Sequence, residues 1–142
     1  MDESVAHISG FGREVRAFEA AVRPVAAAGE APLVPSCPGW TVTDLIAHLG
    51  AVHRYVLRLL RERVQEEPDP ADLDFLGLPA EREGWPVSFE QTPTLGPVPG
   101  SLVDWFAEGA LALEAEFRKS DPRDPVWTWA PEHTAGFWMR IQ

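Results

Sequence analysis

Hydrophobic residues along this 142-residue chain recur at helical spacing in four stretches. In the first stretch, from about Glu3 to Ala28, the apolar positions lie three, four or seven residues apart, which places them on one face of a helix. Pro24 falls near the end of this stretch, where it is expected to kink or shorten the helix. The apolar positions are Val5, Ile8, Val15, Phe18, Val22 and Val25.

The second stretch has a well-marked beginning at Thr41. Asp44 follows three residues later, which predicts a capping box, and Trp40 precedes the cap, where it is expected to act as a hydrophobic staple. The pattern continues to about Gln65. The positions predicted to face the core are Leu45, Leu49, Val52, Val56, Leu59 or Leu60, and Val64.

Residues 67–100 interrupt the helical pattern and hold seven of the 14 prolines and four glycines. A loop of this length is uncommon inside a compact domain. Two interpretations are open: the segment wraps the bundle, or it is an unpacked insertion. Wrapping is the favoured one, because large apolar side chains are available as anchors. These are Leu73, Phe75, Leu76, Trp85 and Phe89.

The third stretch begins at Ser101, and Asp104 three residues later predicts a second capping box. It stops at the sequence KSDPRDP, which starts at residue 119. Its predicted buried face is formed by Leu102, Phe106, Gly109, Leu113 and Phe117.

The fourth stretch is short. Thr134 is the predicted N-cap, the helix begins at Ala135, and its apolar face is formed by Phe137, Trp138 and Ile141. The preceding VWTW alternates in polarity but is too short to predict a strand. Together the four stretches predict an all-α fold, an antiparallel or crossover four-helix bundle that forms one domain over residues 1–142.

The formal net charge of -10 argues against binding to nucleic acid or to an anionic membrane surface, because both interactions depend on cationic side chains. No stretch approaches the roughly 18 apolar residues of a membrane span. The single cysteine, Cys37, allows no internal disulfide bond, and the acidic start MDESVAHISG is not expected to act as a signal peptide. These features predict a cytoplasmic protein.

Two histidines lie on the second predicted helix. His48 follows Leu45 by three residues and precedes Val52 by four, so it is expected at the edge of the buried face, pointing into the bundle. From position alone, a hydrogen-bonded core histidine is favoured over a metal ligand. His53 is rotated by about 140° from His48, so the two rings cannot share one ion, and His53 is expected at a boundary or in solvent.

The remaining candidates for chemistry are weaker. His7 is expected on the surface of the first helix and His133 in a loop. Cys37 lies in a turn between prolines, and a nucleophilic cysteine needs a neighbouring base that lowers its pKa. No such base is near it in the sequence. Cys37 is therefore predicted to be a small buried residue of the turn.

The stretch VPSCPGWTVTDLIAHLGAVHRYV, residues 34–56, resembles the opening motif of the mycothiol-dependent maleylpyruvate isomerase family. The N-terminal domains of that family belong to the DinB-like superfamily of metal-binding four-helix bundles. The stretch DPVWTWAPEHTAGFWMRIQ, residues 124–142, is similar to the segment that leads into the family's last helix. The two motifs bracket residues 4–142, and the first is the more specific.

The resemblance implies a divalent metal, commonly zinc, held between helices of the bundle, with His48 as one ligand. The family's other protein ligands come from a His-Glu-x-x-x-His motif, which would begin just after Gln142. Since a catalytic zinc usually has three protein ligands, we expect this chain to be cut short in its last helix. As a monomer it is then expected to bind zinc weakly or not at all and to lack activity.

For the intact protein, the resemblance implies an isomerase or a thiol transferase. Its partners would be a small-molecule thiol, mycothiol, used as cosubstrate, and an electrophilic substrate. Two rival hypotheses are a non-catalytic binding or regulatory module that has lost the metal site, and a homodimer formed through the incomplete bundle.

Overall fold

The computed structural model of the protein describes residues 3–69, 73–86 and 93–142. Its elements are α1 (Glu3–Ala27), α2 (Val42–Arg61), the short 3-10 helix η1 (Leu73–Leu76), α3 (Gly100–Lys119) and α4 (Ala135–Ile141). Within these ranges β pairing is limited to two isolated bridges, Leu33 with Thr41 and Pro125 with Thr134. The predicted all-α fold is therefore confirmed, and its four α-helices are consistent with the DinB-like bundle that the resemblance implies.

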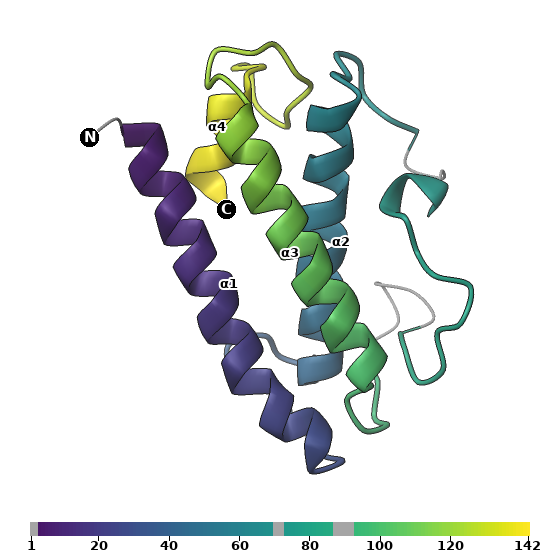
Figure 1. Ribbon diagram of the computed structural model, residues 1–142. Coiled ribbons are helices and arrows are strands. Elements are labelled where there is room, and N and C mark those ends of the chain that lie inside the picture. The colour runs from purple at the N-terminus through teal and green to yellow at the C-terminus, as the bar shows by residue number, and fades with distance from the viewer. Residues whose placement is uncertain (1–2, 70–72, 87–92) are drawn as a thin grey trace.

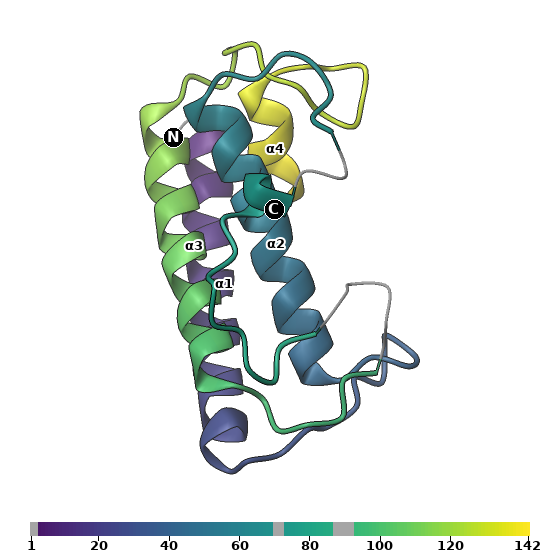
Figure 2. The same cartoon turned by 90° about the vertical axis from the view of Figure 1, so that its right-hand side faces the viewer.

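The helices form a bundle with a crossover connection. In Figure 1, α1 and α4 run in one direction, and α2 and α3 run in the other. Because α2 and α3 are parallel, the segment between them returns along the outer side of α2, as Figure 2 shows. Helix α3 packs against both α1 and α2, and α4 packs against α1. Among the described helices, none combines the length and the low polarity that crossing a membrane requires.

The first helix follows its predicted face only in part. Ile8, Val15 and Val22 are buried, whereas Val5 is 42% exposed. Phe11, which the pattern did not include, is also buried and joins the core. The helix contains Pro24 and ends three residues later, at Ala27.

The capping box at the start of α2 is confirmed. The Thr41 side chain accepts a hydrogen bond from the Asp44 backbone N–H, and the Asp44 carboxylate accepts one from the Thr41 N–H. The same carboxylate accepts two more hydrogen bonds from Thr94, from its backbone N–H at 2.9 Å and from its hydroxyl at 2.7 Å. Burial alone would raise the pKa of Asp44, but the hydrogen bonds from Thr94 and Thr41 hold it below the usual value.

The buried face of α2 differs from the predicted one in its first half. Leu45, Leu49 and Val52 are only partly buried. The core side is formed instead by smaller residues, because the Trp105 ring of α3 lies directly against the Cα of Gly50. The pattern of large aliphatic residues missed this close contact between helices. The buried residues of α2 are Thr43, Asp44, Ile46, Ala47, Gly50, Ala51, His53, Val56, Leu57, Leu59 and Leu60.

The contact at Gly50 predicts opposite effects for two glycine substitutions. A Cβ at position 50 would lie 2.5 Å from Cζ3 of Trp105, whereas a Cβ at Gly10 meets nothing closer than Arg13 Nη2 at 3.9 Å. Gly50→Ala is expected to destabilise by about 1–2 kcal/mol, since overpacking outweighs the gain in helix propensity. Gly10→Ala, the matched control, is expected to stabilise by up to about 1 kcal/mol. Urea denaturation of both variants measures the difference, and equal shifts would contradict the packing of Trp105 on Gly50.

The predicted buried face of α3 is confirmed, because Leu102, Phe106, Gly109, Leu113 and Phe117 are all buried. The predicted capping box of this helix is wrong. The N-cap is Pro99, which has no side-chain donor or acceptor to cap with. The two residues of the predicted box have other partners. The Ser101 hydroxyl oxygen accepts a hydrogen bond from Trp85 Nε1 at 2.9 Å, and the Asp104 carboxylate accepts one from Arg23 Nη1 at 2.6 Å.

The connector between α2 and α3 wraps the bundle where it is described. Trp85 is buried, and its ring packs against Trp105 with centroids 5.3 Å apart. Phe75 and Leu76 are half-buried and pack on the core, and the two hydrogen bonds from Thr94 to Asp44 fasten the segment to the start of α2. Of the other predicted anchors, Phe89 and the side chain of Leu73 lie outside the described part of the chain.

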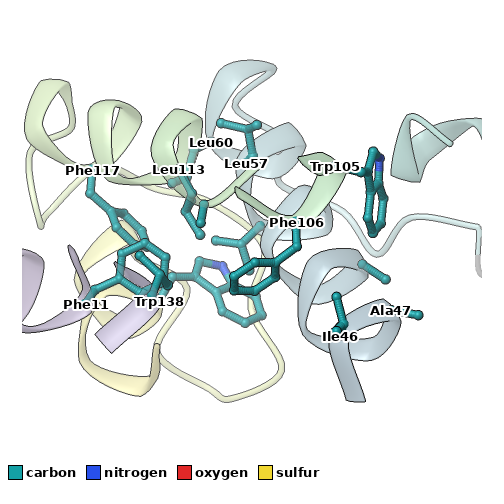
Figure 3. Close-up of a cluster of buried hydrophobic side chains, with 14 of the residues drawn as sticks. Phe11, Ile46, Ala47, Leu57, Leu60, Trp105, Phe106, Leu113, Phe117 and Trp138 are labelled. Carbon is teal, nitrogen blue, oxygen red and sulfur yellow. The ribbon is translucent and has the colours of Figure 1, made fainter. Parts of the chain in front are cut away.

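The last helix is short but is held by one large side chain. Trp138 is fully buried, and its Nε1–H donates to the Trp127 carbonyl at 2.8 Å. Figure 3 shows Trp138 beside Phe11 and Phe117, where α1, α3 and α4 meet. The predicted apolar face of this helix needs correction: Trp138 lies in the core, Phe137 is half-buried and Ile141 is exposed. Trp138 is therefore not available for contact with a second copy of the chain, and the homodimer stays a prediction.

Candidate functional site

The candidate site is a pocket beside His48, on the outer face of α2. The pocket has a volume of about 350 Å³. It lies between α2, the start of the connector and the loop before α4. The residues that line it are His48, Ala51, Val52, Tyr55, Glu67, Pro68, Leu76 and Trp129.

His48 does not point into the bundle as predicted. Its side chain is exposed, and its ring lies edge-on to Trp40 with centroids 5.3 Å apart. The small residues of α2 face α3, so the helix is rotated relative to the predicted orientation, and His48 moves to the pocket side. Trp40, predicted to be a hydrophobic staple, thus provides one neighbour of the candidate ligand.

Trp129 is presented to the pocket by a loop with internal hydrogen bonds. The buried Thr128 hydroxyl donates toward the Ala130 and Glu132 carbonyls and accepts from the Ala130 N–H. The Trp127 N–H donates to the Val64 carbonyl at 2.7 Å, which ties this loop to the end of α2. Trp129 nevertheless remains 59% exposed.

The wall of the pocket is an aromatic cluster. The rings of Trp129 and Tyr55 are stacked, with centroids 6.0 Å apart and an angle of 20° between their planes. Behind them, Trp138 lies edge-on to Trp129 at 4.7 Å. A tryptophan held in solvent beside a pocket, on a loop fastened by the hydrogen bonds of Thr128 and of the Trp127 backbone, is typical of a ligand-binding surface.

His53, predicted at a boundary or in solvent, is instead a core residue with 6% of its surface exposed. Its ring packs against Phe11 and Phe106, with centroids 5.1 and 5.5 Å away. Its Nδ1 is buried and has no hydrogen-bond partner among the described residues. Burial, with a smaller effect from His48, lowers the pKa of His53 from 6.5 to about 4. His53 is therefore a neutral core histidine, and it also lines a second pocket of about 240 Å³ between α1, α2 and α3.

The other candidates stay apart from the pocket beside His48. His7 is half-buried on α1, 3.6 Å from Glu3, and His133 is exposed in its loop with its ring 5.0 Å from Trp127. Cys37 is half-buried, and its backbone takes part in the hydrogen bonds of the turn. Its N–H donates to the Val34 carbonyl, and its own carbonyl accepts from the Trp40 N–H. These contacts place Cys37 in the turn as predicted, but its side chain is half-buried rather than buried.

The described residues do not by themselves fit a divalent metal. No group of three His, Cys, Asp or Glu side chains close enough to hold an ion is found among residues 3–69, 73–86 and 93–142. His48 offers one imidazole. Among the described residues that line its pocket, Glu67 offers one carboxylate. A zinc site usually takes three or four protein ligands, so a metal at His48 would need ligands from outside the described residues.

Sequence reasoning missed Tyr55, Glu67 and Trp129 as residues of the site. A signal for Trp129 was present in the alternation of the VWTW stretch. Val126 and Thr128 are buried, and the tryptophan that follows Thr128 points outward. Glu67 had no such signal, because its place in the pocket depends on how the connector turns back over α2.

A comparison with protein-family models identifies the family of this chain. The model of the mycothiol maleylpyruvate isomerase N-terminal domain matches residues 11–142, nearly the whole sequence. No curated protein and no solved structure matches the chain. The chain therefore belongs to the mycothiol maleylpyruvate isomerase N-terminal domain family.

Proposed function

We propose that this chain is the metal-binding domain of a thiol-dependent enzyme of the isomerase or thiol-transferase type, with His48 as one ligand of a divalent metal. A family match over residues 11–142 supports a mycothiol-related domain. The observation that carries the proposal is the position of His48. Its imidazole is exposed at a pocket of about 350 Å³, where a metal, a small thiol and a substrate could be brought together.

The local structure supports this role for His48 because its position on α2 is well defined. The capping box at Thr41 and Asp44 determines where the helix begins, and the second turn of the helix then carries His48. Trp40 packs edge-on against the imidazole and limits its rotation. A ligand whose orientation is restricted before the metal arrives loses less entropy on binding.

The pocket size also supports a small-molecule reaction. A volume of about 350 Å³ lies at the lower end of the range for small-molecule sites, and aromatic and aliphatic side chains dominate its lining. The remaining ligands of the metal would come from outside the described residues. The described chain alone is then expected to be inactive.

A second candidate function is a non-catalytic binding module that uses the same pocket. The observation that favours it is the lack of a three-ligand group among the described residues. In this case the pocket beside His48 would bind a small molecule without transforming it. The two candidates differ in whether zinc binding depends on His48.

Zinc uptake distinguishes these two functions. The 142-residue chain is expected to lose zinc to a chromophoric chelator, because one imidazole holds the ion weakly. A variant chain that is extended after Gln142 by a helical His-Glu-x-x-x-His segment is expected to retain one zinc per chain. In the extended chain, His48→Ala is expected to abolish retention. Atomic emission after gel filtration measures the zinc content.

The matched control is His133→Ala in the extended chain, since His133 is an exposed loop histidine outside the pocket. It is expected to leave the zinc content unchanged. An extended chain that retains zinc equally well with and without His48 would overturn the proposed ligand. Tight, stoichiometric zinc in the 142-residue chain that His48→Ala abolishes would instead show that a partner chain supplies the missing ligands.

A further inference from the structure

The pocket beside His48 combines aromatic walls with a carboxylate, and none of the described residues that line it is a lysine or an arginine. The stacked rings of Trp129 and Tyr55 form one wall. His48 and Glu67 are the imidazole and carboxylate of the lining. The face of an indole ring attracts a cation, and a neighbouring carboxylate adds to that attraction.

Glu67 is available for a ligand. Its side chain is exposed, and it makes no hydrogen bond or ion pair with the described part of the chain. Arg58, on the same helix as Tyr55, does not line this pocket. Its guanidinium lies over the Phe75 ring, 5.1 Å from the centroid, and it pairs with Glu62.

The charge of the whole chain acts in the same direction. The formal net charge is -10, and a negative surface raises the local concentration of cations and lowers that of anions. A dicarboxylate entering this pocket would meet Glu67, and the described lining residues include no lysine or arginine to balance the charges. The site is therefore poorly suited to a doubly charged anion.

We propose that the pocket beside His48 binds a small organic ammonium ion attached to a flat apolar group, and that it disfavours dicarboxylates. The cation would lie over the exposed face of Trp129 and near Glu67, with the apolar group between Val52 and Leu76. As a statement about the substrate of an enzyme, this rests on the proposed function. As a statement about binding, it is independent of any metal.

The test uses the intact 142-residue chain labelled with 5-fluorotryptophan and followed by ¹⁹F NMR without added zinc. The chain has six tryptophans, and Trp129→Phe identifies the signal of Trp129. Benzyltrimethylammonium is expected to shift this signal saturably, and more tightly than benzyl alcohol or maleate does. Raising the salt concentration is expected to weaken the ammonium binding.

Glu67→Gln is the decisive variant, and Glu66→Gln is its matched control. Glu66 is the neighbouring exposed carboxylate and does not line the pocket. Glu67→Gln is expected to raise the dissociation constant of benzyltrimethylammonium by about two- to five-fold, the range for an exposed charge interaction. Glu66→Gln is expected to change it by less than about two-fold.

Maleate or benzyl alcohol binding as tightly as the ammonium ion would overturn the proposal, as would equal effects of the two glutamate variants. No detectable shift of the Trp129 signal with benzyltrimethylammonium would overturn it as well. Because these titrations contain no zinc, a negative result would not contradict the proposal that His48 is a metal ligand. Likewise, if zinc retention by the extended chain does not depend on His48, the enzyme interpretation fails, but the proposed ammonium site is unaffected.

Discussion

Trp138→Ala is expected to destabilise the protein by about 3–5 kcal/mol, the range for truncating a fully buried tryptophan. Trp138 has no exposed surface and packs where α1, α3 and α4 meet (Figure 3). The substitution leaves a cavity, and the Trp127 carbonyl loses the hydrogen bond from Nε1. Because α4 (Ala135–Ile141) is too short to be stable alone, it is expected to detach in this variant.

The matched control is Trp129→Ala, which removes the same side chain from a position that is 59% exposed. This variant is expected to lower the free energy of unfolding by less than about 1 kcal/mol. The Trp129 side chain buries less apolar surface than Trp138 does, so less burial is lost when it is removed. Urea denaturation followed by circular dichroism measures both. A loss of less than about 1 kcal/mol for Trp138→Ala would contradict the docking of α4 through this residue.

Trp138→Ala is also expected to disturb the pocket beside His48. The Trp138 ring lies edge-on to the rings of Trp129 and Tyr55, with centroids 4.7 and 6.3 Å away. It therefore supports the aromatic wall from behind. Loss of this support is expected to weaken benzyltrimethylammonium binding while Glu67 is unchanged. The short last helix therefore connects the stability of the bundle to the geometry of its candidate site.

The buried His53 is expected to make the protein less stable as the pH falls from about 6.5 to about 4. Burial, and to a smaller extent His48, lowers the pKa of His53 from 6.5 to about 4 in the folded state. Over this interval the unfolded chain binds a proton at His53 and the folded chain does not, so unfolding becomes easier. A shift of this size corresponds to about 3 kcal/mol by linkage.

His53→Leu is expected to remove this pH dependence. Leucine takes no proton and leaves no unpaired ring nitrogen in the core, so the variant is expected to be about as stable as the wild type at pH 7. The free energy of unfolding is measured in urea at several pH values between 4 and 7. The difference between wild type and variant is expected to change by about 3 kcal/mol across this range.

His133→Leu is the control for the pH experiment, because His133 is exposed in its loop. It is expected to retain the wild-type slope, since carboxylates such as Asp44 titrate in both proteins. The pKa of Asp44 is held low in the folded state, so the stability that it contributes is lost only as the pH falls below its unfolded value. Equal slopes for wild type and His53→Leu would show that His53 is solvated.

Much of the fold could be predicted from the sequence. Helix boundaries were close where local chemistry marks them, as at Thr41 and Asp44, which form the predicted capping box. They were less accurate where the signal was ambiguous. The second helix ends at Arg61 rather than near Gln65, and the third is capped by Pro99 rather than by Ser101.

The orientation of α2 could not be predicted from its own residues. Large aliphatic side chains lie on one face and small ones on another, and either could have faced the core. The packing of Trp105 against Gly50 decided between them, because a glycine allows the closest approach of a neighbouring helix. That contact exposes His48 and buries His53, the reverse of the predicted arrangement.

The sequence by itself determined the helical class, the start of α2 and the likeness of residues 34–56 to a known family, because short-range spacing and local hydrogen bonds carry that information. Only the tertiary structure decided which histidine reaches the pocket and that Glu67 and Trp129 lie beside it. These residues come from segments that are distant in the chain and meet through packing. The composition of the candidate site is therefore a property of how α2, the connector and the loop before α4 fit together.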